Sequence, residues 1–367
     1  MEPASLEQRS RGLWSNPFLD RVRRSYKLAL TISDDHYGRM WRVIDQHRAP
    51  VHVALLADTS DALRKIFADP AASDLFNGID YLRRNVMGAT LGSDVIIAGS
   101  ALGNGSVKEH LENAAKRTFA LLPKSWQDAR LPFPNPFPNE CGLQTPTGLA
   151  SYRAIQAVYA ASLIQSALLT CKNKSVIEIG PGMGRTAYYA YHLGIKDYTT
   201  VDLPLGVVAQ ACFLGAVLGP DSIWMQGDEA TAEGRIRLLV AGEKPDKMYG
   251  VAFNSDSMTE MSLPAALDYM TWLQQHCECF VSVNVTDNLF TVKDISRKWF
   301  TIVNQRPYPM EPGYTEETFI PRQFPGLMAW HRIVWHITKL VFKRGPKRAI
   351  SSLYQRAQSR LRRSTVV

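Results

Sequence analysis

One short segment constrains the fold of this chain more than any other. Residues 175–184 read SVIEIGPGMG, an apolar, β-branched run that ends in glycines at every second position, and the helical stretch RTAYYAYHLG follows at once. Where a strand turns into a helix through Gly180, Gly182 and Gly184, the backbone can approach a ligand that side chains would block. The segment therefore predicts a nucleotide-like cofactor at a strand-to-helix turn.

The segments around this turn repeat the same alternation. Helical stretches separate five apolar, β-branched runs, which are SVIEIG, YTTVDL, SIWMQG, KMYGVAFN and CFVSVNV. Such alternation is typical of a parallel sheet with helices on both faces. Two later runs, WFTIVN and GYTEETFI, are expected to form an antiparallel edge pair. We expect an α/β fold with a Rossmann-like sheet, mostly parallel with an antiparallel edge, and an N-terminal helical extension.

Three regions are expected along the chain. Residues 1–140 show helical spacing and no catalytic motif, and they end near LPFPNPFP, whose prolines forbid a long helix or a central strand. This region is predicted to be a mostly helical lid or dimerisation region, which implies a homodimer in the second case. Residues 141–326 are predicted to be the cofactor-binding domain, opening with a long helix from Pro146, and residues 327–367 an amphipathic and basic tail.

The net charge of +8 comes from the tail. Residues 343–367 contain eight basic side chains and no acidic one, so the other 34 basic residues balance 34 acidic ones. We therefore expect no nucleic-acid partner. The tail is predicted to lie on an anionic membrane surface, or else to be a docked helix with a solvated end. The chain shows no signal peptide and no apolar run long enough to span a bilayer, so we expect a cytoplasmic protein. If the tail binds a membrane, the protein is expected to be peripheral to the inner membrane face.

The residues around the glycines distinguish between two kinds of cofactor. A dinucleotide fingerprint has its third glycine where this chain has Arg185, which is expected to crowd a pyrophosphate. Glu178, before the first glycine, suits a cofactor with an ammonium and a sulfonium group and repels a pyrophosphate. The pattern favours S-adenosylmethionine (SAM) over a nicotinamide dinucleotide.

Other residues are expected to bind the same cofactor. Asp202 ends the second strand, where a carboxylate can accept both hydroxyls of a ribose, although an N-cap of the following helix is an equal alternative. Leu203 is expected to lie against the adenine, and Asp228 or Glu229, after the third strand, to meet its exocyclic amine.

Three segments resemble the family of sugar O-methyltransferases, class I SAM-dependent enzymes associated with glycan and polysaccharide gene clusters. They are VIEIGPGMGRTAYYAYHLGIKDYTTVDLP, NSDSMTEM (residues 254–261) and PYPMEPGYTEE (residues 307–317), within a match over roughly residues 140–320. The resemblance implies methylation of a hydroxyl on a sugar or glycan intermediate, which for a membrane-associated enzyme would be lipid-linked. Many relatives have a histidine after the fifth strand, whereas this chain has Asn284, so a histidine base is not expected there.

Methyl transfer to a hydroxyl requires a group that removes its proton. The loop after the fourth strand is dense in polar residues, and Asp256 is the first candidate for general base or substrate anchor, with Glu260 second. An N-cap of the helix LPAALDYMTWLQQH is the alternative for Asp256. Asn284 and Asp287 are candidates for binding acceptor hydroxyls, with loop solvation as the alternative. Tyr314, Glu316 and Glu317 are expected either to close the acceptor pocket or to form an exposed acidic turn.

A divalent metal is not expected. Asp256 and Glu260, four residues apart, would suit magnesium, but that spacing is too common to identify a site, and the eight histidines show no ligand spacing. Two rival functions stay open on the sequence: a scaffold protein that binds SAM without turnover, and a nicotinamide-dependent enzyme that modifies sugars.

Overall fold

The computed structural model describes residues 15–31, 38–57, 59–70, 73, 75, 107–128, 131–137, 140–229 and 231–322. All of these except Arg322 belong to one compact unit, Met1–Pro321. The predicted tail over residues 327–367 lies outside the described residues, and so do residues 1–14.

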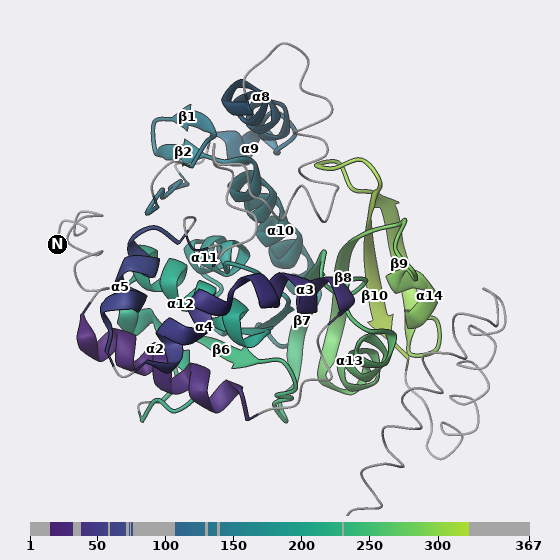
Figure 1. The fold of residues 1–367 in the computed structure, drawn as a ribbon. Helices are drawn as coiled ribbons and strands as arrows, with labels where there is room; N and C mark the ends of the chain where they lie inside the picture. The colour runs from purple at the N-terminus through teal and green to yellow at the C-terminus, as the bar shows by residue number, and fades with distance from the viewer. Residues whose placement is uncertain are drawn as a thin grey trace, which may run out of the picture. The chain divides into compact units, whose positions relative to one another are not determined.

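An eight-stranded sheet organises this unit (Figure 1), in the order β5-β6-β4-β3-β7-β8-β10-β9. Its strands are β3 (Val176–Ile179), β4 (Tyr198–Asp202), β5 (Ile223–Met225), β6 (Ile236–Val240), β7 (Tyr249–Ser255), β8 (Cys277–Val285), β9 (Phe300–Pro307) and β10 (Tyr314–Pro321). The pairs from β5 to β8 are parallel, whereas β10 is antiparallel to both β8 and β9. The predicted α/β fold, a mostly parallel Rossmann-like sheet with an antiparallel edge, is confirmed.

Helices cover both faces of the sheet. One face carries α10 (Tyr152–Leu168), α11 (Arg185–His192) and α12 (Pro204–Leu218), and the other carries α13 (Leu263–His276) and α14 (Val292–Ser296). Neighbouring residues of one strand point to opposite faces, so Val176 packs in the core of the first group of helices and Ile177 in the core of the second. Both cores are built from fully buried apolar side chains, as a parallel sheet requires.

Two sequence predictions about elements were wrong. The helix expected from Pro146 begins at Tyr152, with Ser151 as its N-cap, and the preceding residues form a hairpin of β1 (Leu143–Thr145) and β2 (Gly148–Ala150). Proline occupies the turn of this hairpin, where the missing amide hydrogen costs nothing. Strand β6 was not predicted, because no helix separates its five residues from β5.

The N-terminal helices pack onto the sheet domain (Figure 1). They are α2 (Asn16–Ala29), α3 (Arg39–His47), α4 (Ala49–Leu56), α5 (Asp61–Ala68), α8 (Val107–Phe119) and α9 (Lys124–Gln127), and a 3-10 turn, η2 (Pro220–Ser222), precedes β5. Helix α2 contacts α12 and β5, and α8 contacts α10. Arg24 of α2 donates to the carbonyl of Gly227 at 3.2 Å. Residues far apart in sequence are thus brought to the loop that follows β5.

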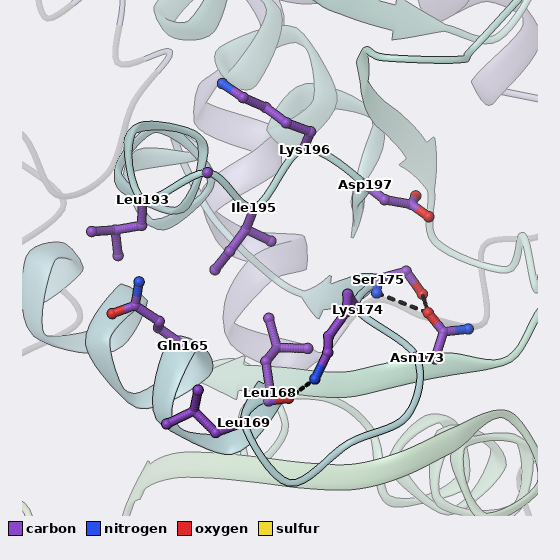
Figure 2. Close-up of a pocket in the computed structure, with 11 residues that line it drawn as sticks. Gln165, Leu168, Leu169, Asn173, Lys174, Ser175, Leu193, Ile195, Lys196 and Asp197 are labelled. Carbon is purple, nitrogen blue, oxygen red and sulfur yellow. Dashed lines mark hydrogen bonds between the residues drawn. The ribbon is translucent and has the colours of Figure 1, made fainter.

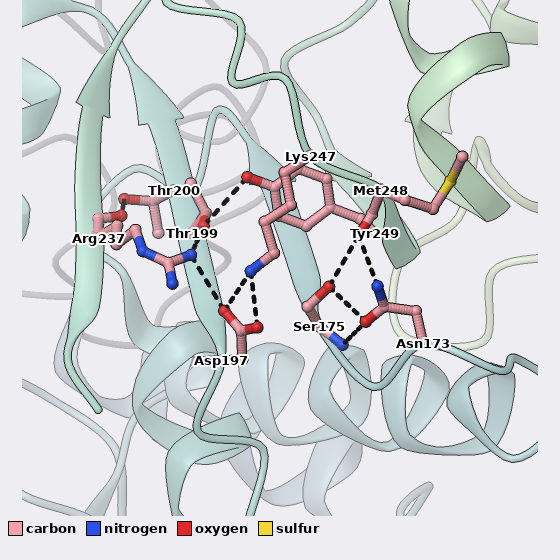
Figure 3. Close-up of polar contacts among 9 residues, drawn as sticks. All are labelled: Asn173, Ser175, Asp197, Thr199, Thr200, Arg237, Lys247, Met248 and Tyr249. Atoms are coloured by element: carbon pink, nitrogen blue, oxygen red, sulfur yellow. Dashed lines mark hydrogen bonds and ion pairs between the residues drawn. The ribbon is translucent and has the colours of Figure 1, made fainter. Parts of the chain in front are cut away.

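Two sets of polar contacts connect neighbouring strands at the amino edge of the sheet (Figure 3). Asn173 Oδ1 accepts from the amide and hydroxyl of Ser175 at 2.9 and 2.8 Å, and Asn173 Nδ2 donates to the carbonyl of Met248 at 2.7 Å. Asp197 forms ion pairs with Arg237 at 3.0 Å and Lys247 at 2.6 Å. The first group joins the entry of β3 to that of β7, and the second joins the entries of β4, β6 and β7.

Asn173→Ala is expected to lower the free energy of unfolding by about 1–3 kcal/mol, because it removes two hydrogen bonds to backbone groups and one from the Ser175 hydroxyl. Urea denaturation measures this loss. Lys247→Ala is the matched control, since it breaks an exposed ion pair at the same edge and should cost less than about 1 kcal/mol. Equal unfolding midpoints for the two variants would contradict the role given to Asn173.

Candidate functional site

The predicted glycine turn lies at the carboxyl end of β3. The backbone dihedral φ is +71° at Gly180, +58° at Gly182 and +82° at Gly184, a left-handed conformation that favours glycine. The Gly180 amide donates to the carbonyl of Val201 at 2.8 Å, so the turn is fixed to the end of β4, and Gly184 is the N-cap of α11. The sequence thus predicted this strand, turn and helix as they occur.

Asp202 connects the end of β4 to the glycine turn. Its carboxylate accepts from the amides of Gly182 at 3.1 Å and Leu203 at 2.7 Å, and from Gln210 Nε2 at 3.0 Å. Leu203 is the N-cap of α12, with no side-chain capping bond, so the N-cap alternative for Asp202 was wrong. Burial raises the pKa of Asp202 to about 7, against the lowering effect of these donors.

Glu178 is a second acidic group below the same turn. Its side chain is buried in β3 and accepts from the Tyr198 hydroxyl at 2.8 Å. Burial raises the pKa of Glu178 to about 7, the hydrogen bonds from Tyr198 and Thr186 oppose that rise, and the nearby charge of Asp202 adds to it. A cationic ligand at the glycine turn would stabilise the ionised forms of these two carboxyl groups.

Arg185 does not lie where the sequence analysis expected it. Its guanidinium is buried, forms an ion pair with Glu140 and lies 5.3 Å from the centre of the Phe213 ring. The side chain therefore packs between α11, α12 and the segment before β1. The expected crowding of a ligand by Arg185 was wrong, because Glu140 and Phe213 hold the side chain within the protein.

The two candidates for the adenine amine differ in their surroundings. Arg21 of α2 donates to both carboxylate oxygens of Asp228, at 3.0 and 2.7 Å, and the Met225 amide donates at 2.9 Å. Burial works against ionisation of Asp228, yet these donors and the charge of Arg21 hold its pKa below the usual value. Asp228 thus anchors the N-terminal helix α2, whereas Glu229 is exposed.

Asp256 has an unusual backbone at the end of β7. Its φ of +66° makes it the one non-glycine residue with positive φ among the described residues, and its amide donates to the carbonyl of Val283 at 2.9 Å. The N-cap of α13 is Ser262, whose hydroxyl accepts from the Ala265 amide, so the N-cap alternative for Asp256 was wrong. Left-handed conformations of this kind are strained and concentrate at functional sites.

Glu260, in the same loop, is held by the N-terminal region. Trp41 Nε1 of α3 donates to Glu260 Oε2 at 2.8 Å. The backbone of Gly38 packs so closely that an added Cβ would lie 1.9 Å from the Glu260 carbonyl oxygen. Helix α3 therefore begins directly against the loop that carries Asp256.

A network of neutral side chains supports this loop. Asn284 Nδ2 donates to Asn254 Oδ1 at 2.7 Å and to Ser282 Oγ at 2.9 Å, and Asn254 Nδ2 donates to the carbonyl of Ile179 at 2.8 Å. Both amide hydrogens of Asn284 are thus used inside the protein, which favours a supporting role over binding of acceptor hydroxyls. Asn254 was noted in the sequence only as part of a polar loop, and its bond next to Gly180 couples that loop to the glycine turn.

The acidic pair of β10 is buried. Glu316 accepts from the Tyr159 hydroxyl at 3.0 Å and from Arg306 Nε at 2.9 Å. Glu317 accepts from Gln305 Nε2 at 3.0 Å, and burial raises its pKa to about 7. The exposed acidic turn was therefore a wrong alternative for this pair. No spacing rule predicts the contacts of Glu316 with Tyr159 and Arg306, which lie 157 and 10 positions away from it.

Tyr314 is half-buried at the start of β10, and its ring centre lies 6.3 Å from that of Tyr308. Asp287 is exposed in the loop after β8, which agrees with the solvation alternative.

A shallow hollow of about 420 Å³ lies at the opposite, amino edge of the sheet (Figure 2). It is lined by Gln165, Leu168, Leu169, Asn173, Lys174, Ser175, Leu193, Gly194, Ile195, Lys196 and Asp197. Lys174 Nζ points back to the carbonyl of Leu168 at 2.6 Å, so its charge caps the end of α10. Because ligands of open α/β sheets bind at the carboxyl edge, this hollow is separate from the candidate site.

Metal-binding clusters and membrane-spanning helices are both absent from the described part of the chain. No three or more His, Cys, Asp or Glu side chains gather there in a way that could hold a metal ion. None of the described helices is both long and apolar enough to cross a membrane.

The fold is that of an α/β protein with a Rossmann-like sheet, and the candidate ligand site lies at the carboxyl edge of that sheet. No protein-family model matches the chain, and no curated protein matches its sequence.

Among solved structures, the chain is similar to the glycopeptide N-methyltransferase MtfA complexed with SAM, at 14% identity over 45% of this chain and 88% of that chain, with a TM-score of 0.34. It is also similar to the CcbJ methyltransferase from Streptomyces caelestis, at 12% identity over 46% and 90% of the two chains, with a TM-score of 0.35. An O-methyltransferase family protein from Burkholderia thailandensis gives 10% identity over 47% and 58%, with a TM-score of 0.35. Likenesses this weak establish no function for this chain.

Proposed function

We propose that this chain is a SAM-dependent O-methyltransferase that acts on a hydroxyl of a sugar or glycan intermediate. The observation that supports this cofactor is the glycine turn beside two carboxyl groups, that of the buried Glu178 and that of the half-buried Asp202. An added Cβ on Gly182 would meet nothing within 4 Å, so the turn borders open space. A cofactor with an ammonium and a sulfonium group fits beside these carboxyl groups better than a pyrophosphate does, because like charges repel.

The predicted cofactor residues other than Asp228 keep their roles in this proposal. Gly180, Gly182 and Gly184 let the backbone approach the cofactor. Asp202 accepts the ribose hydroxyls, Leu203 lies against the adenine, and the exposed Glu229 meets the exocyclic amine. Asp228 instead fixes α2 through Arg21 and so shapes the same loop.

SAM supplies an electrophilic methyl group when it is bound. The chain must then orient an acceptor hydroxyl and take its proton, and we assign that role to Asp256 at the end of β7. Glu260, fixed by Trp41, would anchor the acceptor, and Asn284 would hold the loop through Asn254. No metal takes part in this proposal.

The sugar acceptor is supported by the resemblance of residues 254–261 and 307–317 to sugar O-methyltransferases. Under the same proposal the enzyme serves polysaccharide biosynthesis in the cytoplasm, and the basic tail brings it to lipid-linked glycans on the inner membrane face. Liposome binding that is unchanged after removal of residues 327–367 would contradict the role of the tail.

Calorimetric titration with SAM, S-adenosylhomocysteine (SAH) and NAD tests the cofactor. We expect SAM and SAH to bind and NAD not to bind. Asp202→Ala should weaken SAH binding roughly 10- to 150-fold, because hydrogen bonds to a charged acceptor contribute about 1.5–3 kcal/mol. Wild-type affinity should also fall as the pH drops below about 7, where Asp202 takes up a proton.

The matched control is Asp197→Ala, which removes a carboxylate from the opposite edge of the sheet and should leave SAH affinity unchanged. Binding of NAD alone, or of none of the three ligands, would contradict the proposal. SAM binding without methyl transfer to any nucleotide sugar or glycan fraction would instead support a scaffold protein.

A further inference from the structure

The turn between β9 and β10 holds a glutamate on a rigid support. Tyr308 and Met310 of this turn are buried in the core that also contains α10. Pro309 and Pro312 restrict the backbone further, because the proline ring fixes φ. Glu311 lies between these residues and is half-buried. The turn therefore presents the Glu311 side chain at the surface from a fixed backbone.

Two side chains of α10 orient this carboxylate. Glu311 Oε2 accepts from Gln156 Nε2 at 2.9 Å and from the Tyr152 hydroxyl at 3.2 Å. Arg153 donates to Gln156 Oε1 at 3.0 Å, and its guanidinium lies 5.8 Å from the centre of the Tyr152 ring. All four side chains are half-buried. A carboxylate has about four acceptor sites, so one that is oriented by two bonds can still accept from a ligand.

The turn is connected to the loop that carries the proposed base. The carbonyl of Gly313 accepts from the amide and the hydroxyl of Thr286, after β8, at 2.9 and 3.0 Å. Two residues further on, Asn288 Nδ2 donates to Thr259 Oγ1 at 2.7 Å. Thr259 belongs to the same loop as Asp256. Hydrogen bonds thus run from the β9–β10 turn along the carboxyl ends of β8 and β7.

The same circuit closes through the glycine turn. The Ser257 hydroxyl donates at 2.9 Å to the carbonyl of Ile179, directly before that turn. Helix α11 begins after the turn and packs against α10, which carries Tyr152 and Gln156. Because ligands of open α/β sheets bind at this edge, the circuit surrounds the region where cofactor and acceptor would meet.

We propose that Glu311, oriented by Gln156 and Tyr152, binds hydroxyls of the sugar acceptor other than the one that is methylated, and so determines which acceptor is used. This inference rests on the proposed methyl transfer. A site built to bind a substrate hydroxyl rejects an analogue that lacks it. Glu316 does not share this role, because it is buried and paired with Arg306 at 2.8 Å.

The test is methyl transfer from radiolabelled SAM to a panel of UDP-, GDP- and dTDP-linked hexoses and their deoxyhexose analogues. For the hexose that the wild type methylates, Glu311→Gln should raise KM about 10- to 100-fold and leave kcat within about threefold. The variant should also lose the preference of the wild type for that hexose over its deoxy analogue. Tyr152→Phe, which removes one of the two orienting bonds, should raise KM less.

Glu233→Gln is the matched control, since Glu233 is an exposed glutamate before β6, at the amino edge of the sheet. It should behave as wild type, and SAH affinity should be unchanged in every variant. If Glu311→Gln does not fold, Gln156→Ala takes its place with the same expected rise in KM.

An unchanged KM in Glu311→Gln, or a fall in kcat alone with the substrate preference kept, would overturn the inference, because a merely structural role does not alter that preference. Wild-type protein that transfers methyl to no member of the panel would be the failure of the proposed function itself, and it is seen without any variant.

Discussion

Asp256→Asn is expected to lower the methyl-transfer rate constant by about 10²- to 10⁴-fold and to leave SAH affinity unchanged. A general base contributes an acceleration of this size, and an amide cannot take the proton of the acceptor hydroxyl. Asparagine tolerates the left-handed backbone that Asp256 adopts at φ +66°, so the loop should keep its shape. Single-turnover rates with the identified acceptor and calorimetry with SAH measure the two quantities separately.

Asp256→Gly separates strain from chemistry at the same position. Glycine adopts a positive φ without cost, so this variant should be about 1 kcal/mol more stable than wild type while it is as slow as Asp256→Asn. Glu260→Gln is the matched control, a second acidic residue of the loop with a smaller expected loss of rate. Full activity in Asp256→Asn would assign the base elsewhere, and a large loss in Glu260→Gln alone would place it at Glu260.

The parts of the fold that the sequence predicted are those encoded by local patterns. The apolar run of β3, the glycine turn and α11 are contiguous, and β9 and β10 carry their own alternation. Strand β6 was not predicted, because four apolar residues interrupted by Arg237, with no helix after them, do not stand out from a loop. The hairpin before α10 was not predicted, because Leu149 also fits the helical spacing. The turn at Pro146 favours the hairpin instead.

The candidate site was predictable only at its centre. Asp202 follows from its distance after the glycines, but the partners of the site come from remote segments. Trp41 and Glu260 are 219 positions apart and Arg21 and Asp228 are 207 apart, so no spacing rule relates them. Asp228 was expected at the adenine because its position after the third strand fits that role. Arg21, which donates to both oxygens of Asp228, is too far away in the sequence for this contact to be predicted.

Two glycines of the turn should respond differently to alanine, because their surroundings differ. An added Cβ on Gly180 would lie 2.1 Å from Ser257 Oγ, which donates to the Ile179 carbonyl at 2.9 Å, whereas one on Gly182 would enter open space. Gly180→Ala should therefore destabilise the fold by about 2–4 kcal/mol, through overpacking and the strain of a positive φ. Gly182→Ala carries only the strain, about 1–2 kcal/mol.

The binding data should show the opposite order. A methyl group on Gly182 would occupy the space that the proposed cofactor needs, and it would disturb the hydrogen bond from the Gly182 amide to Asp202. SAH affinity should therefore fall roughly 100- to 1,000-fold. Urea denaturation and calorimetry on the two variants measure both effects. If Gly182→Ala bound SAH as wild type does, the open space beside the turn would not be the cofactor site, and the carboxyl groups of Glu178 and Asp202 would then need another cation to explain them.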